Sequence, residues 1–290
     1  GTRTEGALST WRKIFAETSE TRPLTRILAT HMHPDHIGLA GWLTRKFNCP
    51  LWMTRTEYLN CRVLVSDTGK PAPPDAITFF KRAGWSDQNL EAYMARFGNF
   101  GQFIHPMPDS YQRLVDRQQL QIGAHQWQVI VGTGHSPEHA CFYCPELKLF
   151  ISGDQVLPKI SSNVSVHPAE PDADPMHGWL ESLAKLKRLV PDDVLVLPAH
   201  NEPFRGLHAR IDQLDRSQRR ALGRLHLHLA EPRRVIDVFS ALFSRPITGE
   251  DPGLLGLATG ESMACLNYLR HRDLLTVRVD DEGIAWYQAC

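Results

Sequence analysis

The sequence predicts an α/β layer fold followed by a small C-terminal unit. Two short apolar runs, at residues 27–29 and 51–53, flank a segment over 37–47 whose apolar residues recur at helical spacing. From Leu120 onward the period becomes two, as in QWQVIVGTG, which is typical of half-buried strands. This order of strand, loop, helix and strand, followed by a β meander, predicts helices packed against sheets.

Other elements follow from the same patterns. Residues 9–18 form a predicted helix behind a Ser-Thr cap, and the region between about 54 and 118 changes to helical patterns separated by the breaker KPAPPD. We interpret this region as a helical insertion in the α/β body; its aromatic residues form a small core and are candidates to roof a substrate pocket. The remaining expected elements are helices over 55–64, 75–83, 88–97 and 180–189, and a strand ending at His200.

The composition changes past Arg205, where a long helix rich in Arg, Leu and His begins. Two more helical segments follow, and then the alternating pair LLTVRV and GIAWYQ around the turn DDEG. Three helices and a terminal hairpin are typical of a winged-helix-like unit. We therefore expect a domain over 1–224 and a winged-helix-like C-terminal domain over 225–290.

Composition narrows the class of protein. The chain has 290 residues, 42% of them hydrophobic, and equal numbers of acidic and basic residues, so a polyanionic partner is not indicated. It contains no apolar run long enough for a membrane span and no signal-peptide pattern, which makes the cytoplasm the expected location. Six scattered cysteines are too sparse for a disulfide scaffold, and we expect reduced thiols, mostly in the core, with Cys290 exposed.

The stretch THMHPDH carries three histidines and one aspartate directly after the first predicted strand. If the chain stays extended there, His31 and His33 point to the same side and can bind one metal ion, while Asp35 and His36 on the turn point toward a second. Imidazole and carboxylate groups are the ligands expected for Zn²⁺, or for Fe²⁺ or Mn²⁺, rather than for Ca²⁺. The stretch therefore predicts a metal site.

Three further ligand candidates lie where later predicted strands end. His135 follows QVIVGTG, Asp154 follows LFISG, and His200 follows VLVLPA. Open α/β sheets place their binding sites at such strand ends, so we expect these side chains to meet the histidine cluster.

These segments resemble the metallo-β-lactamase superfamily over about residues 25–205. THMHPDHIGLAG is similar to the superfamily's H-x-H-x-D-H motif, and GTGHSPEH, SGDQVL and PAHNEP are similar to its later metal-binding segments. The resemblance implies an αββα sandwich with a dinuclear metal centre. It also implies the ligands: His31, His33 and His135 for one metal, Asp35, His36 and His200 for the second, and Asp154 as the bridge.

The bridging position narrows the branch. It holds Asp154, where the lactamases that name the fold carry cysteine or another arrangement, so the chain resembles the glyoxalase II, lactonase and nuclease branches and a β-lactam substrate is disfavoured. By this resemblance, we expect the superfamily's usual N-terminal β-hairpin and its aspartate motif to be missing before residue 9. We expect two divalent ions, Zn²⁺ first, with Fe or Mn left open.

The ligand set indicates a hydrolase. Two such metals would supply a bridging hydroxide as the nucleophile and would polarise the substrate oxygen, and Asp35 would accept a proton as well as bind metal. Such a centre offers little protonation of the leaving group, which favours an activated acyl bond, a thioester or lactone, in a small molecule.

Two alternative activities stay open. The winged-helix-like tail is compatible with a metal-dependent phosphodiesterase or endoribonuclease, although the balanced charge disfavours a nucleic-acid partner. A mononuclear iron dioxygenase acting on a persulfide is the other. We expect no membrane partner, and the sequence leaves a homo-oligomer open.

Secondary candidates surround the ligands. The polar loop after Asp154 carries Lys159 and Asn163, which we assign to substrate binding. His139 is expected to support a ligand from behind or to be structural. Cys141 and Cys144 form a C-x-x-C pair on a strand, where they point to opposite faces, and no second pair accompanies them; we assign them no metal or redox role.

Overall fold

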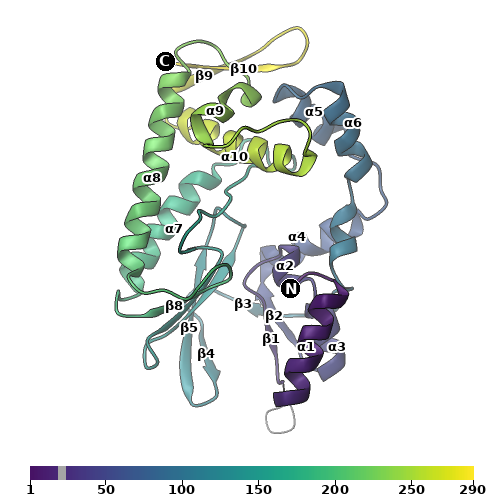
Figure 1. Cartoon of the computed structure of the whole chain (residues 1–290), viewed down its shortest axis with the longest axis vertical. Coiled ribbons are helices and arrows are strands. Elements are labelled where there is room, and N and C mark those ends of the chain that lie inside the picture. The colour runs from purple at the N-terminus through teal and green to yellow at the C-terminus, as the bar shows by residue number, and fades with distance from the viewer. Residues whose placement is uncertain (19–23) are drawn as a thin grey trace. The chain divides into compact units, whose positions relative to one another are not determined.

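The computed structural model describes residues 1–18 and 24–290 (Figure 1). These residues divide into two compact units. Unit 1 comprises Gly1–Pro71, Phe97–Gly132 and Ser136–Gly153, and unit 2 comprises Ala72–Arg96, Thr133–His135 and Asp154–Cys290. The predicted helical insertion is therefore divided: residues 72–96 belong to unit 2 and its two ends to unit 1. The domain boundary near residue 225 stays a prediction.

Unit 1 contains two β-sheets. In the first, β1, β2 and β3 run parallel, and β3 is a strand inside the segment that we predicted to be helical. In the second, β4 to β7 form the predicted antiparallel meander. The strands are β1 (Ile27–Leu28), β2 (Leu51–Thr54), β3 (Gln112–Leu114), β4 (Gln119–Ile122), β5 (His125–Gly132), β6 (His139–Cys144) and β7 (Leu149–Gly153).

Apolar side chains from both sheets form one core in unit 1. Trp127 and Val129 alternate along β5 toward this core, and Leu114 of β3 and Trp52 of β2 pack into it from the first sheet. The period of two in the sequence is thus explained by one buried face of the meander. This sheet-on-sheet core is the centre of the predicted sandwich.

A second core covers the other side of the parallel sheet. It includes Ile37, Met53 and Tyr58, and α3 and α4 contact β2 there. The helix predicted over 37–47 is interrupted at Gly38 and Leu39, which divide it into α2 and α3. The helices of unit 1 are α1 (Glu5–Thr18), α2 (Pro34–Ile37), α3 (Ala40–Phe47), α4 (Arg55–Ser66) and the 3-10 helix η1 (Asn99–Phe103).

Unit 2 is mainly helical and is organised around α10. This helix is buried along most of its length and contacts α6, α7, α8 and α9. Trp85, between α5 and α6, donates a hydrogen bond from Nε1 to Thr259 Oγ1 on α10 (2.9 Å). The elements are α5 (Pro74–Arg82), α6 (Asp87–Arg96), α7 (Pro175–Leu189), β8 (Leu195–Pro198), α8 (Leu207–His228), η2 (Val235–Val238), α9 (Phe239–Leu242), α10 (Pro252–Arg270), β9 (Leu275–Val279) and β10 (Ala285–Ala289).

The C-terminal elements follow the predicted order. Helices α8, α9 and α10 precede the antiparallel hairpin of β9 and β10. The winged-helix character of this region stays a prediction. No helix in the described part of the chain is both long enough and apolar enough to cross a membrane. Five cysteines are free and buried and Cys290 is exposed, as predicted.

Candidate metal centre

The histidine-rich stretch of unit 1 is a loop that leads from β1 into α2. β1 ends at Leu28, so His31 and His33 lie beyond the strand rather than in it. His33 keeps an extended backbone (φ −61°, ψ 147°) as the N-cap of α2, and Pro34 starts the helix. The residue before a proline favours an extended backbone, so the loop has the extended conformation that we expected from a strand.

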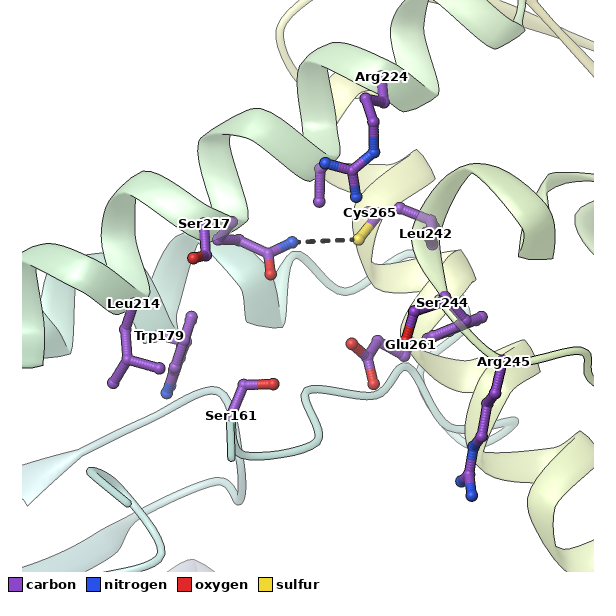
Figure 2. A pocket seen from close by; sticks show the side chains of 13 residues that line it. Ser161, Trp179, Leu214, Ser217, Arg224, Leu242, Ser244, Arg245, Glu261 and Cys265 are labelled. Carbon is purple, nitrogen blue, oxygen red and sulfur yellow. Dashed lines mark hydrogen bonds between the residues drawn. The ribbon is translucent and has the colours of Figure 1, made fainter. Parts of the chain in front are cut away.

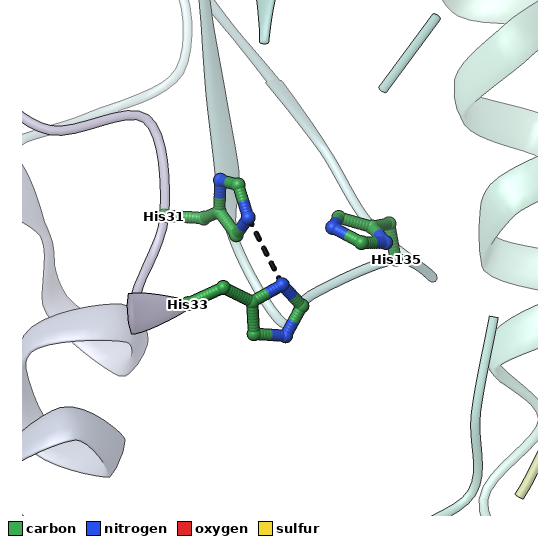
Figure 3. A group of neighbouring side chains, drawn as sticks. All are labelled: His31, His33 and His135. Atoms are coloured by element: carbon green, nitrogen blue, oxygen red, sulfur yellow. Dashed lines mark hydrogen bonds between the residues drawn. The ribbon is translucent and has the colours of Figure 1, made fainter. Parts of the chain in front are cut away.

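The four predicted ligands of this stretch lie close together, His31 and His33 in the loop and Asp35 and His36 in α2. The Nε2 atom of His31 is 3.0 Å from Nδ1 of His33, as the dashed line in Figure 3 shows. His36 Nε2 lies 3.2 Å from Asp35 Oδ2, and the ring centroids of His31 and His36 are 4.0 Å apart. His31 is fully buried, whereas the Asp35 side chain is 44% exposed. The stretch thus gathers imidazole and carboxylate groups at one place, part of it open to solvent.

A buried glutamate that the sequence analysis missed holds this loop. Glu57 of α4 is fully buried and accepts the backbone N–H of Met32 at Oε2 (2.9 Å) and that of Glu138 at Oε1 (2.9 Å). Met32 lies between the two leading histidines. Because a buried carboxylate is stable only when its oxygens are hydrogen-bonded, this pair of bonds fixes the loop against α4. Glu57 lies in a helix and belongs to no sequence motif, so no signal in the sequence indicated this role.

His139 at the start of β6 supports the loop from a second side. Its ring is fully buried and stacks on His31, with centroids 4.7 Å apart and planes at 29°. Gly153 packs closely behind it: a Cβ there would lie 2.4 Å from Cε1 of His139, and the φ of +53° also favours glycine. This geometry agrees with the supporting role expected for His139.

Unit 2 carries the other three predicted ligands, and they also converge. Oδ2 of Asp154 lies 3.4 Å from Nε2 of His135 and 3.4 Å from Nε2 of His200. Two ligand atoms of a tetrahedral zinc site, each at about 2.0 to 2.1 Å from the ion, are about 3.4 Å apart. The spacing is too long for good hydrogen bonds and suits ligands that share a cation.

The orientation of His135 is set by its neighbours in unit 2. Its Nδ1 lies 2.7 Å from the backbone carbonyl oxygen of Asn163. Since a carbonyl can only accept, Nδ1 carries the proton, and the lone pair of Nε2 faces Asp154. Gly134, with φ of +98°, lets the preceding backbone pack against α7, because a Cβ there would be 2.4 Å from Cβ of Trp179.

The two predicted substrate contacts behave differently. Lys159 is exposed on the loop after Asp154. The amide of Asn163 donates from Nδ2 to Glu261 Oε2 (2.8 Å) and its Oδ1 accepts from Ser165 Oγ (2.5 Å). The Asn163 side chain therefore braces the segment whose carbonyl holds His135, a role that its sequence position did not indicate.

The candidate ligands of each unit fit divalent metal ions. Unit 1 supplies three imidazoles and one carboxylate and unit 2 supplies two imidazoles and one carboxylate, the ligand types that zinc, iron and manganese accept. Cys141 and Cys144 are buried within β6, and the thiol of Cys141 lies 3.4 Å from the carbonyl oxygen of Ser152. Among the described residues the groups that could hold a metal ion contain no cysteine.

Comparisons with known proteins identify the family. Residues 1–200 match the family model of the Metallo-beta-lactamase superfamily, and residues 222–290 match that of the Metallo-beta-lactamase-like, C-terminal domain. A beta-lactamase domain protein from Burkholderia ambifaria is similar in structure, with TM-score 0.89 and 33% identity over 100% of this chain and 82% of that one. A metallo-beta-lactamase family protein from Thermus thermophilus shares the fold, with TM-score 0.80 and 22% identity over 100% of this chain and 88% of that one.

No curated protein matches the chain. The family match covers the loop of unit 1 and all three ligands of unit 2, and the members of this family are typically metal-dependent hydrolases. The chain belongs to the metallo-beta-lactamase superfamily.

Proposed function

We propose that the protein is a dinuclear metal-dependent hydrolase that cleaves an activated acyl bond, a thioester or lactone, of a small molecule. The observation that carries the proposal is the carboxylate of Asp154, one oxygen of which is equally distant from His135 and His200. A carboxylate held between two imidazole nitrogens is suited to bridge two ions.

The ligands divide as the family resemblance implies. His31, His33 and His135 would hold one ion and Asp35, His36 and His200 the other, with Asp154 between them. Two bound divalent ions would supply Lewis acidity and lower the pKa of a bound water. We take Zn²⁺ as the metal, with Fe and Mn as alternatives that metal loading distinguishes.

Asp35 is the residue that we assign to proton transfer. Its side chain is 44% exposed, against 8% for Asp154, so Asp35 can exchange a proton with solvent while Asp154 cannot do so readily. Nε2 of His36 lies 3.2 Å from Oδ2 of Asp35, so the two predicted ligands of the second ion are neighbours. Asp35 therefore accepts the proton that the attacking water loses.

An acyl substrate fits the surroundings of the ligands. Glu57 and His139 lie behind the ligand loop, Glu57 with both oxygens engaged by backbone N–H groups and His139 fully buried. Neither is positioned to protonate a leaving group. The thiolate of a thioester and the alkoxide of a strained lactone need less protonation as leaving groups than an amine does. Thioesters and lactones are therefore the expected substrates. Lys159 would contact an acidic group of the substrate.

A phosphodiesterase is the second candidate, favoured by the arginines of α8. Several of these are already engaged: Arg219 Nε contacts both carboxylate oxygens of Asp215 (2.9 and 3.0 Å), and Arg210 Nε donates to the Leu157 carbonyl (2.6 Å). We therefore consider nucleic acid a less favoured substrate than a small acyl compound. The sparse, buried thiols support a cytoplasmic location as part of the proposal.

The test compares three substrate classes on one protein. The metal-free protein is reloaded separately with Zn, Mn and Fe, and kcat/KM is measured on a CoA thioester, a long-chain lactone and a bis-aryl phosphodiester. We expect the acyl substrates to exceed the phosphodiester by at least about 10³-fold, and His31→Ala and His200→Ala to abolish the activity. A phosphodiester preference would establish the second candidate. Full activity with one iron ion bound, and oxygen consumption with a persulfide, would instead establish a dioxygenase.

A further inference from the structure

A cavity of about 330 Å³ lies within unit 2, apart from the seven metal-ligand candidates (Figure 2). Helices α7, α8 and α10 and the segment after α9 form its walls. Leu214, Leu242 and Phe243 give it apolar surface, and Ser161, Arg224 and Glu261 give it polar groups. A mixed lining of this kind is typical of a site for a small organic molecule.

Glu261 of α10 is the acidic group of the cavity. In Figure 2 its carboxylate projects into the cavity, and the Ser161 hydroxyl points toward it. Oε2 accepts a hydrogen bond from Asn163 Nδ2 (2.8 Å), and no cation of the described residues forms an ion pair with this carboxylate. Burial raises the pKa of Glu261 to about 7, against the opposing effect of the Asn163 hydrogen bond. A carboxylate in such a setting is stabilised by a cation that arrives from outside.

Arg224 supplies the opposite charge from α8. Its Nε donates to the carbonyl of Ala241 (3.1 Å), which fixes the side chain, and Figure 2 shows the guanidinium extending from α8 toward the cavity. Within the described part of the chain Arg224 forms no ion pair. Its terminal nitrogens can donate to a carboxylate, the anion that matches a guanidinium best. Arg245 adds a second positive charge to the lining.

We propose that this cavity binds a small zwitterion, whose ammonium group is held by Glu261 and whose carboxylate is held by Arg224. The apolar wall of Leu214, Leu242 and Phe243 covers the carbon chain between the two charged ends. The proposal does not depend on the hydrolase activity, because none of the predicted metal ligands lines the cavity.

The cavity is nevertheless connected to His135. Glu261 accepts from the side chain of Asn163, and the carbonyl of Asn163 accepts from Nδ1 of His135 (2.7 Å). An ammonium group that draws the Glu261 carboxylate into the cavity changes the first of these bonds. Occupancy of the cavity can therefore alter the position of one metal ligand.

Binding should depend on pH in a defined direction. The zwitterion binds the ionised form of Glu261, whose pKa is raised to about 7, so affinity is highest well above pH 7 and falls as the pH drops through 7 and Glu261 is protonated. The other titratable groups that line the cavity are Cys265 of α10, Arg224 of α8 and Arg245 after α9. Burial raises the pKa of the Cys265 thiol, which therefore stays neutral across this range, and arginine stays protonated throughout it.

Calorimetric titration with ω-amino acids tests the site. The probes are 4-aminobutanoate, 5-aminopentanoate and 6-aminohexanoate, because the series spans several separations of the two charges, with n-pentylammonium and hexanoate as single-charge comparisons. We expect the metal-loaded full chain to bind one of the amino acids at least about tenfold more tightly than either comparison at pH 8. Failure of all three amino acids to bind would overturn the proposal.

Two variants assign the charges. Glu261→Gln keeps an oxygen that can accept from Asn163, so it removes the charge but keeps this hydrogen bond. It should lower the affinity for the amino acid by about 10- to 100-fold and leave the affinity for hexanoate unchanged. Arg224→Gln should weaken the binding of hexanoate and leave the binding of n-pentylammonium unchanged. The exposed residues in Glu250→Gln and Arg220→Gln are matched controls outside the cavity. Unchanged affinity in Glu261→Gln would refute the role of Glu261, whatever substrate the metal centre hydrolyses.

Discussion

The two sets of metal-ligand candidates are built in opposite ways. In unit 1 the ligands are neighbours in the sequence, and one buried glutamate with two backbone hydrogen bonds holds their loop. In unit 2 the ligands are up to 65 residues apart in the sequence, from His135 to His200. His135 depends on a close-packed glycine and a carbonyl acceptor.

This difference determines how each set responds to damage. A change at Glu57 should disturb the whole loop at once, because Met32 lies between the two leading histidines. A change at Gly134 or Asn163 should disturb His135 alone. The first set therefore depends on one shared support, whereas His135 in the second set has supports of its own.

The largest effect is expected at Asp154, which His135 and His200 of the second set both face. Asp154→Ala removes the carboxylate that both His135 and His200 face, so kcat/KM on the preferred ester should fall by at least about 10³-fold. Metal content measured on the purified protein should fall with it. The exposed Asp281→Ala, in the turn of the terminal hairpin, is the control and should change neither quantity. Two fully bound ions in Asp154→Ala would refute the bridging role.

Glu57→Ala tests the shared support of the first set. It leaves two buried N–H groups without their acceptor, at about 1 to 3 kcal/mol each, so the free energy of unfolding should fall by about 2 to 6 kcal/mol. Glu57→Gln keeps one accepting oxygen and should lose about half as much in chemical denaturation. Glu17→Ala, an exposed carboxylate of α1, should have no measurable effect. Stability equal to the parent in Glu57→Ala would contradict the role of these bonds.

Gly134→Ala should act on a single ligand. The added Cβ meets Cβ of Trp179 at 2.4 Å, and the φ of +98° is unfavourable for alanine, so we expect a loss of about 2 to 4 kcal/mol in the free energy of unfolding. Competition with a chelator should show that one of two metal ions is weakened more than the other.

Gly223→Ala is the matched control for that substitution. Gly223 lies in α8, and no atom comes within 4 Å of the position that a Cβ would take there, so alanine should stabilise the helix by about 0.5 to 1 kcal/mol. Equal behaviour of the two glycine variants would show that the contact of Gly134 with α7 has no consequence.

A small effect is expected for Asn163→Ala. The substitution removes the side-chain bonds to Glu261 and Ser165 but keeps the backbone carbonyl that accepts from His135. Metal affinity should fall by about tenfold, the lower end for a group that supports a ligand. Ser165→Ala removes only one of those bonds and should have a still smaller effect in the same chelator competition. Loss of both metal ions in Asn163→Ala would mean that the carbonyl is not held independently.

The sequence by itself determined the fold class and the ligand candidates. The period of two in β5 and the density of histidine after β1 are local patterns, and both depend on neighbouring residues alone. Local patterns failed where a short strand had no apolar periodicity of its own. Residues 112–114, for example, are a strand because they pair with β2.

Only the tertiary structure decided what supports the ligands. The bonds of Glu57 join residues 25 and 81 positions away, and the carbonyl that orients His135 lies 28 residues further along the chain. Backbone N–H and carbonyl groups are common to nearly every residue, so no residue type marks the ones that are used. Their selection depends on which segments fold against each other, and that is a property of long-range packing rather than of local sequence.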